Sequence, residues 1–229
     1  MAPGSLNAPA PPIAGRQTLR LLARRSLSPE VFELDLERPP GFRFLPGQRL
    51  RIREGGVERD YTIASGPGEG VLRILVRRVP GGSISPFLCE APPGTAIAAS
   101  GPHGYFVFAP APRTPVFAAT GVGIAPFRSM AASGVRGFVL FHGAGRAGGL
   151  FYREFLEPRA ARYRGCLSRQ AQPLPAGTRP GRVTDALREE LAEGDYDFYL
   201  CGRGEMIAQA LQVIDARFPR ARVFTEPFS

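Results

Sequence analysis

Residues 115–130, PVFAATGVGIAPFRSM, run from a short apolar segment through a glycine-rich turn into a helical stretch. Glycine at positions 121 and 123 lets the backbone turn sharply and approach a phosphate group. The helix that follows offers unpaired N–H groups and a partial positive charge at its first turn. We therefore expect a dinucleotide pyrophosphate to bind at Thr120, Gly121, Val122 and Gly123, although any protein of alternating strands and helices also needs tight turns.

The sequence downstream of residue 111 repeats this alternation of short apolar runs and helical stretches. The expected strands are residues 115–121, 137–144, 164–170 and 197–202, and the expected helices are 126–133, 152–163, 183–193 and 205–218. Strands that alternate with helices form a parallel sheet with helices on both faces. Residues 111–229 are therefore predicted to be a dinucleotide-binding α/β domain.

The sequence upstream of this domain consists of short runs with partial alternation of apolar and polar residues. These runs are residues 18–25, 31–37, 48–54, 59–65 and 71–79, and Pro and Gly separate them. Strands at this spacing are typical of an antiparallel barrel, which we expect to span residues 16–110. Residues 1–15 are rich in Pro, Ala and Gly and carry no charged side chain, so they are expected to form a flexible tail.

The composition is that of a globular protein with a strongly basic charge balance. A hydrophobic content of 44% with 21% charged residues argues against wholesale disorder. No apolar run approaches the roughly 18 residues of a membrane span, and the N-terminus does not have the order of a signal peptide, so a cytoplasmic location is expected. All 29 basic residues are arginine and the net charge is +9, which would attract an acidic protein, nucleic acid or a membrane surface.

The cysteines and histidines do not form a recognisable metal or disulfide pattern. Cys89, Cys166 and Cys201 are odd in number and far apart, which argues against a disulfide framework, a zinc site and an iron–sulfur cluster held by this chain alone. We expect no metal. His103 and His142 are expected to be structural.

Several motifs, in one order along the chain, resemble those of the ferredoxin–NADP reductase family. TGVGIAPFRSM resembles the family's nicotinamide-binding turn, and RDYTIAS (59–65) resembles its flavin signature. Further segments that are similar are GGSISPFL (81–88), GPHGYF (101–106), CLSRQ (166–170), CGRGEM (201–206) and TEPF (225–228). The resemblance implies a β + α/β protein, in which an N-terminal antiparallel flavin-binding β-barrel precedes a parallel-sheet domain that binds a nicotinamide dinucleotide.

On the flavin side, the resemblance assigns roles to two segments. Arg59 would bind a flavin phosphate, Tyr61 would lie against the isoalloxazine ring, and Thr62 would hydrogen-bond near the flavin N5. The remaining flavin-binding residues it implies are Ile63, Ala64, Gly82, Ser83, Ile84 and Ser85. Helix capping by the two serines is an alternative that is compatible with phosphate binding.

On the nicotinamide side, the resemblance implies a 2′-phosphate site and a group of residues near the nicotinamide ring. Ser168 and Arg169 match the family's 2′-phosphate pair, so we expect NADPH rather than NADH, which remains possible. The residues implied near the nicotinamide and flavin rings are Cys201, Gly202, Glu226 and Phe228, with Tyr61, Thr62, Cys201 and Glu226 as catalytic. Met206 is implied as a further cofactor-binding residue. Val122 replaces a threonine of many relatives, which puts a side-chain contact at this position in doubt.

The predicted activity is transfer of a hydride from NADPH to bound FAD, followed by transfer of electrons to ferredoxin, flavodoxin or another acidic carrier, or the reverse. Two alternatives stay open. The enzymatic one is an NAD(P)H–flavin or ferric reductase, and one from another class is an electron-transfer subunit of a larger oxygenase or dehydrogenase complex, inactive alone. A nucleic-acid-binding protein is the remotest alternative, because no recognised nucleic-acid motif is present. FMN remains possible in place of FAD, since GGSIS also resembles the phosphate loop of FMN-containing phthalate dioxygenase reductase.

Overall fold

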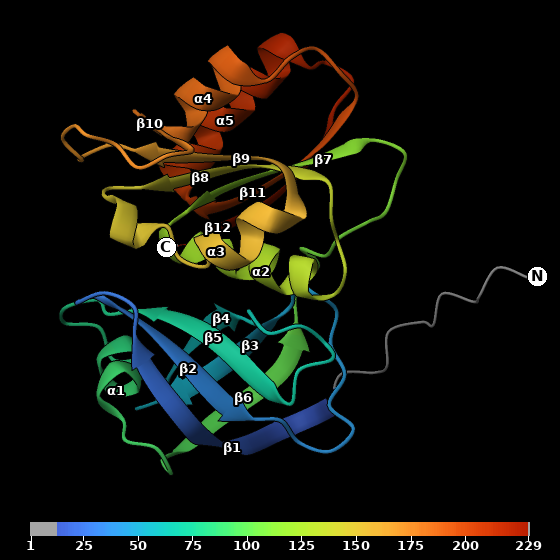
Figure 1. Cartoon of the computed structure of the whole chain (residues 1–229). Helices are drawn as coiled ribbons and strands as arrows, with labels where there is room; N and C mark the ends of the chain where they lie inside the picture. Colours follow the sequence, from blue (N-terminus) through green and yellow to red (C-terminus); the bar gives the residue numbers. More distant parts are fainter. Residues whose placement is uncertain (1–12, 229) are drawn as a thin grey trace, which may run out of the picture.

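The computed structural model describes residues 13–228, which form a six-stranded antiparallel sheet followed by a six-stranded parallel sheet (Figure 1). This confirms the predicted fold class. Most of the predicted tail, residues 1–12, lies outside the described residues. The prediction was wrong for residues 13–15, because β1 already begins at Ile13, where the backbone pairs with β6 at Gly101.

The first sheet is a barrel of strands in the order β4-β3-β6-β1-β2-β5. Its elements are β1 (Ile13–Ser26), β2 (Val31–Glu37), β3 (Arg49–Glu54), β4 (Val57–Thr62), β5 (Val71–Arg77), α1 (Ile84–Glu90) and β6 (Ala96–His103). All its strand pairs are antiparallel. An antiparallel bridge between Ile63 and Ile74 joins the two end strands, and this bridge closes the barrel.

Alternation of side chains along the strands produces the barrel core. In β5, Leu72, Ile74 and Val76 are fully buried, whereas Arg77 is exposed. Burial of each such aliphatic side chain contributes about 1.5–3 kcal/mol. The expected antiparallel barrel is confirmed, although β6 was not among the expected strands because its small residues give a weak hydrophobic pattern.

The second sheet is parallel throughout, in the order β10-β9-β8-β7-β11-β12. Its elements are β7 (Thr114–Thr120), the 3₁₀ turn η1 (Gly121–Ile124), α2 (Ala125–Ala132), β8 (Phe138–Ala144), η2 (Ala147–Gly149), α3 (Arg153–Leu156), η3 (Glu157–Arg159), β9 (Ala160–Leu167), β10 (Thr178–Pro180), α4 (Val183–Glu190), β11 (Tyr196–Arg203), α5 (Gly204–Arg217) and β12 (Arg222–Phe228). Helices α4 and α5 cover one face, and α2 and α3 lie between the other face and the barrel (Figure 1).

One helix was predicted wrongly. The stretch 152–163 was expected to be helical throughout, but α3 ends at Leu156 and β9 already begins at Ala160. Pro158 explains the break, because proline cannot donate the backbone hydrogen bond of a helix and restricts the residue before it. The short edge strand β10 and the C-terminal strand β12 were not expected as strands either.

The two domains share a continuous apolar interface. Val31, Ala64 and Leu75 of the barrel belong to the same buried cluster as Phe127 and Met130 of α2. A shared core of this kind restricts movement between the domains, because separating them would expose apolar surface to water. No helix in residues 13–228 has both the length and the apolar character needed to cross a membrane.

Candidate active site

The strand order of the parallel sheet indicates a candidate binding site between β7 and β11. From β7 the chain proceeds to β8, β9 and β10 on one side, whereas β11 and β12 lie on the other side. Connections leave the carboxyl ends of β7 and β11 in opposite directions, and a crevice that binds ligands forms at such a switch point. Thr120 ends β7 here, and Cys201 and Gly202 lie near the end of β11.

Two glycine-containing turns are in close contact at this point. A Cβ atom on Gly202 would lie 2.2 Å from Thr120 Oγ1, and one on Gly123 would lie 2.4 Å from the Cys201 carbonyl oxygen. The backbone N–H of Arg203 donates to Thr120 Oγ1 at 3.2 Å. Gly202 also has a φ of +139°, which side chains disfavour. Glycine at these positions therefore brings the predicted pyrophosphate turn and the CG turn together.

The turn at 121–123 has the geometry expected for close approach of a ligand. Gly121 has a φ of +57°, and a Cβ atom there would contact nothing, so its backbone borders open space. Val122 is half-buried and packs against the interdomain cluster. The valine side chain therefore has a packing role, and the backbone of the turn remains available to a phosphate.

The barrel strand β4 and the residues after it carry the predicted flavin signature, which reaches the interdomain cluster at Ala64. Tyr61 is half-buried against the barrel core, and burial raises its pKa to about 12. Ile63 and Ala64 are fully buried, whereas Arg59 is exposed, and within residues 13–228 its guanidinium donates only to the neighbouring Glu58 carbonyl, at 2.8 Å. Arg59 is thus free to bind a phosphate.

Thr62 provides a test of whether the site fits a flavin. Its hydroxyl oxygen Oγ1 is buried and has no hydrogen-bond partner among the described residues. A buried polar atom without a partner is unfavourable, so partners are almost always present in native proteins. The polar edge of an isoalloxazine ring has donors and acceptors that suit a hydroxyl, and the site therefore fits this group.

The loop before α1 presents the second predicted flavin segment. Ser85, in the first turn of α1, is buried, and its Oγ accepts a hydrogen bond from the Val79 backbone N–H at 3.0 Å, so this serine stabilises the loop that precedes the helix. Ser83 is exposed at the N-terminal boundary of α1 and makes no side-chain capping bond. A Cβ atom on Gly82 would lie 3.1 Å from the Val79 carbonyl oxygen, which favours glycine there. Ile84 packs into the barrel core.

The C-terminal strand brings Glu226 beside Cys201. These two residues are register partners in β12 and β11, and both are buried. Arg49 Nη1 of the barrel donates to Glu226 Oε1 at 2.8 Å, and Arg49 is itself the register partner of Thr62. Arg49 therefore links the strand end that carries Thr62 to the pair formed by Cys201 and Glu226. Sequence reasoning missed this arginine, because 29 arginines in one chain hide any particular one.

Burial controls the protonation of both residues of this pair. Burial raises the pKa of Glu226, and the Arg49 guanidinium opposes this by favouring the ionised carboxylate. Burial also raises the pKa of Cys201 well above its ordinary value, so its side chain is a neutral thiol. A neutral, fully buried thiol acts as a small packing side chain and not as a nucleophile.

Two other residues predicted to bind the cofactors are distributed over both faces of the sheet. Phe228, the register partner of Arg203, is half-buried against the interdomain cluster, on the side of the barrel. Met206 lies at the start of α5 and packs into the cluster beneath α4 and α5. The structure therefore does not bring Met206 together with Thr62 and Glu226.

Ser168 and Arg169 follow the carboxyl end of β9, and both are exposed. Their backbone N–H groups donate to the carbonyl oxygens of Ala144 at 3.1 Å and Gly145 at 2.8 Å. The segment is thus fixed to the end of β8, at the same edge of the sheet as the glycine-rich turn.

Comparison with known proteins agrees with this arrangement. Residues 18–108 match the family model described as oxidoreductase FAD-binding domain, and residues 117–212 match the model described as oxidoreductase NAD-binding domain. Ferredoxin–NADP reductase B of Sorangium cellulosum is 36% identical over 91% of this chain and 96% of its own length. The chain belongs to the ferredoxin–NADP reductase family. It is a flavin-dependent oxidoreductase with FAD and a nicotinamide dinucleotide as cofactors, as predicted.

Other members of the ferredoxin–NADP reductase family extend the comparison. The toluate 1,2-dioxygenase electron transfer component of Pseudomonas putida is 32% identical over 76% of this chain, which spans 55% of that relative's length. The crystal structure of a ferredoxin NADP⁺ reductase from Neisseria gonorrhoeae with bound FAD and NADP superimposes with a TM-score of 0.81. It covers 93% of this chain and 99% of its own, and at 21% identity the match concerns the fold.

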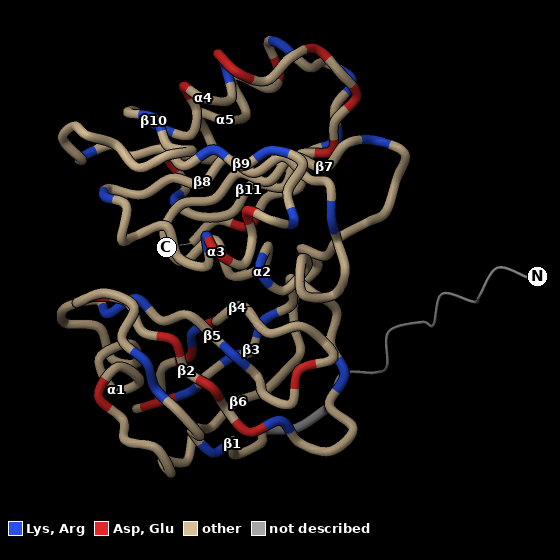
Figure 2. Tube along the Cα trace, in the orientation of Figure 1, with Lys and Arg blue, Asp and Glu red and all other residues tan. Residues whose placement is uncertain are grey.

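Two further arginines lie at the edge of the sheet that carries the glycine-rich turn. Arg146 follows β8 and Arg203 ends β11, and both are exposed, as is Arg169. Within residues 13–228, none of the three forms an ion pair, although basic positions elsewhere are mostly paired and spread over both domains (Figure 2). Their position after parallel strands was the signal that sequence reasoning overlooked.

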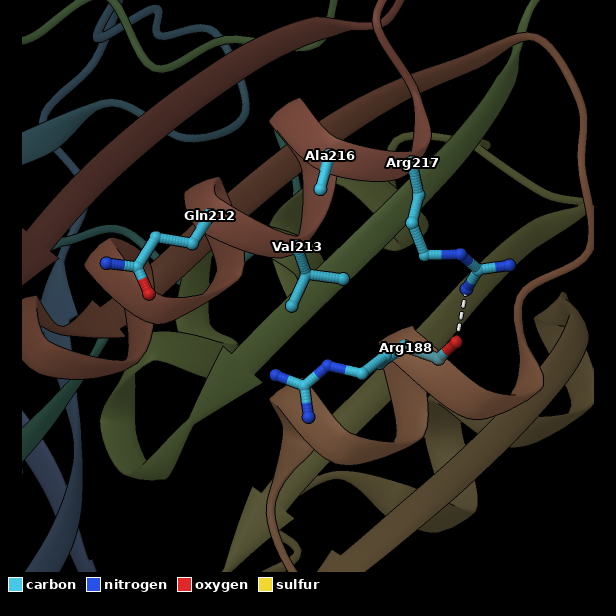
Figure 3. Close-up of a pocket in the computed structure, with 5 residues that line it drawn as sticks. All are labelled: Arg188, Gln212, Val213, Ala216 and Arg217. Atoms are coloured by element: carbon cyan, nitrogen blue, oxygen red, sulfur yellow. Dashed lines mark hydrogen bonds between the residues drawn. The ribbon is translucent and has the colours of Figure 1, made fainter.

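A surface hollow between α4 and α5 lies apart from this edge. It measures about 200 Å³ and is lined by Arg188, Gln212, Val213, Ala216 and Arg217 (Figure 3). Arg217 donates to carbonyl oxygens in and just after the last turn of α4, among them those of Leu187 at 3.3 Å and Leu191 at 3.0 Å. The hollow therefore lies beside the C-terminus of α4, where Arg217 stabilises the helix by binding its last carbonyl oxygens.

The histidines and cysteines of the described residues support no metal site. No group of three or more potential ligands among His, Cys, Asp and Glu occurs within residues 13–228. His142 is fully buried, its Nδ1 lies 3.0 Å from the Tyr163 hydroxyl, and burial lowers its pKa to about 3. A neutral histidine in this position is a packing residue.

Proposed function

We propose that the protein transfers a hydride from NADPH to bound FAD and then passes electrons to an acidic carrier of the ferredoxin or flavodoxin type, or catalyses the reverse. The observation that carries this proposal is the convergence of Thr62, Cys201 and Glu226. They come from β4, β11 and β12: Glu226 is the register partner of Cys201, and Arg49, the register partner of Thr62, pairs with Glu226.

The residues divide into a flavin group and a nicotinamide group. Tyr61 would cover the flavin ring, Thr62 would hydrogen-bond its polar edge, and Arg59 and the loop with Ser83 and Ser85 would bind its phosphates. FAD supplies the capacity to accept a hydride and to release electrons singly. The two groups of residues would hold donor and acceptor within about 3–3.5 Å of each other, which would remove much of the entropic cost of their encounter.

NADPH is favoured over NADH by the charge at the carboxyl edge of the sheet. Arg169 and Arg146 are exposed there without ion pairs among the described residues, beside the hydroxyl of Ser168. An arginine at this place in a dinucleotide-binding domain accommodates a 2′-phosphate, whereas a carboxylate would favour a free 2′-hydroxyl. The comparison of kcat/KM for NADPH and NADH tests this part, and a preference for NADH would contradict it.

An acidic protein carrier is favoured by the net charge of +9. Complementary charge accelerates encounter with a partner, and added salt screens the attraction. Reduction of a purified acidic ferredoxin, followed by stopped flow, should therefore slow as ionic strength rises. A rate that does not depend on salt would exclude steering by charge. The proposal includes a cytoplasmic location and no nucleic-acid partner.

A second candidate is an electron-transfer subunit of an oxygenase, and the names of several relatives favour it. These include the toluate dioxygenase component and the propane 2-monooxygenase reductase component of Rhodococcus jostii, which is 32% identical over 83% of this chain. The chain spans 55% and 57% of the lengths of these two relatives. Co-purification with an iron–sulfur partner would distinguish this candidate from a free-standing reductase.

The remaining alternative is a reductase of diffusible flavin or ferric iron. The buried, unpartnered hydroxyl of Thr62 and the exposed Arg59 favour a flavin that stays bound. Gel filtration of the flavin-loaded protein decides between the two. Flavin that elutes with the protein supports the proposal, and flavin that elutes separately supports the alternative.

A further inference from the structure

Helix α2 connects the two cofactor sites directly. Its preceding turn is the predicted pyrophosphate site, and its far end packs against residues 64–66, which directly follow Tyr61–Ile63 in the flavin signature. We propose that Arg128 and Ser129 are positioning residues, which fix the nicotinamide site relative to the flavin site by binding the backbone of this segment. The inference rests on the proposed hydride transfer between the two cofactors.

Three consecutive residues of the barrel contact one face of α2. Arg128 Nη1 donates to the Ala64 carbonyl oxygen at 2.9 Å, and Ser129 Oγ donates to the Ser65 carbonyl oxygen at 2.6 Å. One residue further along, a Cβ atom on Gly66 would lie 2.8 Å from the Ala132 Cβ, so only glycine permits this approach. The helix is therefore held at successive backbone positions rather than at a single point.

The same segment is held by the barrel through its N–H groups. The N–H of Ile63 donates to the Gln48 carbonyl at 2.9 Å, and that of Ala64 donates to the Arg73 carbonyl at 2.7 Å. Ser65 Oγ accepts a bond from the Arg73 N–H at 3.0 Å. The segment thus binds the barrel through its N–H groups and the Ser65 hydroxyl while its carbonyl oxygens bind α2, and a shift of α2 would be transmitted to the flavin signature.

Arg128 occupies a site that is built around its guanidinium group. The residue is 7% exposed, and it forms an ion pair with Glu69, in which Nη2 lies 3.2 Å from Oε2. The rings of Phe155 and Tyr152 lie 4.9 Å and 5.6 Å from the guanidinium carbon. A planar donor group that binds a carbonyl oxygen and a carboxylate at once requires arginine, because lysine is a point charge without this geometry.

The other end of α2 is equally fixed. Gly123 of the preceding turn packs against the Cys201 carbonyl oxygen, and Ile124 is fully buried. Arg128 lies five residues after Gly123, which is about 7.5 Å of helix at a rise of about 1.5 Å per residue. This short, buried helix therefore sets the spacing between the two sites. Hydride transfer depends steeply on such spacing, and a displacement of about 1 Å can cost on the order of 100-fold in rate.

The test compares Arg128→Met and Ser129→Ala with a matched control, Arg136→Met. Arg136 follows α2, is exposed and forms no ion pair within the described part of the chain, so its loss should change nothing. Each flavin-loaded protein is mixed with NADPH without oxygen, and the rate of flavin reduction in a single turnover is measured. We expect a fall of roughly 10- to 100-fold for Arg128→Met and a smaller fall for Ser129→Ala, with dissociation constants for FAD and NADP⁺ within about threefold of wild type.

Two readouts separate positioning from a general structural role. Charge-transfer absorbance, which appears when nicotinamide and reduced flavin stack, should weaken in Arg128→Met and persist in Arg136→Met. Amide hydrogen exchange at residues 63–66 should accelerate in Arg128→Met and Ser129→Ala before any nicotinamide is added. If Arg128→Met does not fold, Ser129→Ala and Glu69→Gln decide by the same measurements.

Two results would overturn the inference. The first is a reduction rate in Arg128→Met, or in Ser129→Ala with Glu69→Gln, equal to that of wild type. The second is a rate that falls only in proportion to lost flavin, with unchanged charge-transfer absorbance per bound flavin. A wild-type protein that binds no flavin, or whose flavin NADPH does not reduce, would instead refute the proposed function.

Discussion

The ion pair between Arg49 and Glu226 joins the barrel to the C-terminal strand, and its loss should weaken the interdomain contact in a pH-dependent way. Arg49 Nη1 lies 2.8 Å from Glu226 Oε1, and the side chains of Arg49 and Glu226 are 32% and 9% exposed, respectively. Exposed pairs contribute about 0.2–1 kcal/mol, whereas removal of one partner of a buried pair costs about 3–5 kcal/mol. With one partner buried and the other partly solvated, we expect a coupling energy of about 1–2 kcal/mol.

The pH dependence follows from the protonation of Glu226. Burial, together with the nearby Asp60 carboxylate, raises its pKa in the folded protein above the ordinary 4.5, while Arg49 opposes the rise. Because the pKa of Glu226 is higher in the folded than in the unfolded protein, its protonated carboxyl group stabilises the fold below pH 4.5. This stabilisation is lost as the pH rises through the pKa of the folded state. Arg49 offsets part of this loss, so Arg49→Gln should be more damaging at high pH than at low pH.

The assay is a double-mutant cycle of Arg49→Gln and Glu226→Gln, read by thermal unfolding at about pH 8 and about pH 4. At the higher pH, a coupling of 1 kcal/mol corresponds to roughly 2–4 °C for a chain of this size. At the lower pH the carboxyl group is protonated and the coupling should largely disappear. Arg53→Gln is the control, because Arg53 lies on the same strand but pairs with Glu58. A coupling below about 0.3 kcal/mol at the higher pH, or an equal coupling at both values, would refute the reasoning.

Three further outcomes are expected. Gly202→Ala should destabilise the protein by about 1–3 kcal/mol and weaken NADP⁺ binding, because the new Cβ would meet Thr120 Oγ1 at 2.2 Å and φ is +139°. Gly204→Ala, which meets no atom within 4 Å, is its control, and equal melting temperatures for the two variants would contradict this account. Arg169→Glu should lower kcat/KM for NADPH by about 10- to 100-fold and change that for NADH much less, as measured by steady-state kinetics; a parallel loss with both dinucleotides would show that Arg169 does not bind the 2′-phosphate. Val122→Thr should change the dissociation constant of NADP⁺ only modestly, since the backbone of the turn is expected to bind the pyrophosphate, and complete loss of turnover would show that it does not.

The site was only partly predictable. The motifs identified Thr62, Cys201 and Glu226, and the structure brings them together. Met206 was implied as a cofactor-binding residue by the resemblance of CGRGEM, and in the structure it lies in α5 and packs into the cluster beneath α4 and α5, so its contact with a cofactor stays a prediction. Arg49 and Arg128 were not predicted. Nothing in their own segments distinguishes them, because their partners lie 177 and 59 residues away in the chain.

The sequence by itself determined the two-domain order, the antiparallel and parallel classes of the sheets, and the family. These features depend on local information: the period of the hydrophobic pattern, the placement of glycine and proline, and short motifs in a fixed order. The prediction of a helix was wrong for residues 157–163. The helical character of this stretch ends at Pro158, and the residues after it pair with β8 and form β9.

Only the tertiary structure decided how the two cofactor sites face each other. Three contacts that join the elements of the structure are made by residues far apart in sequence. They are the bridge between Ile63 and Ile74 that closes the barrel, the hydrogen bond from Arg128 to the Ala64 carbonyl, and the ion pair of Arg49 with Glu226. Such contacts become favourable only when the chain has already brought both partners together and removed them from water. Their existence is therefore a property of the folded packing, which no single segment of the sequence encodes.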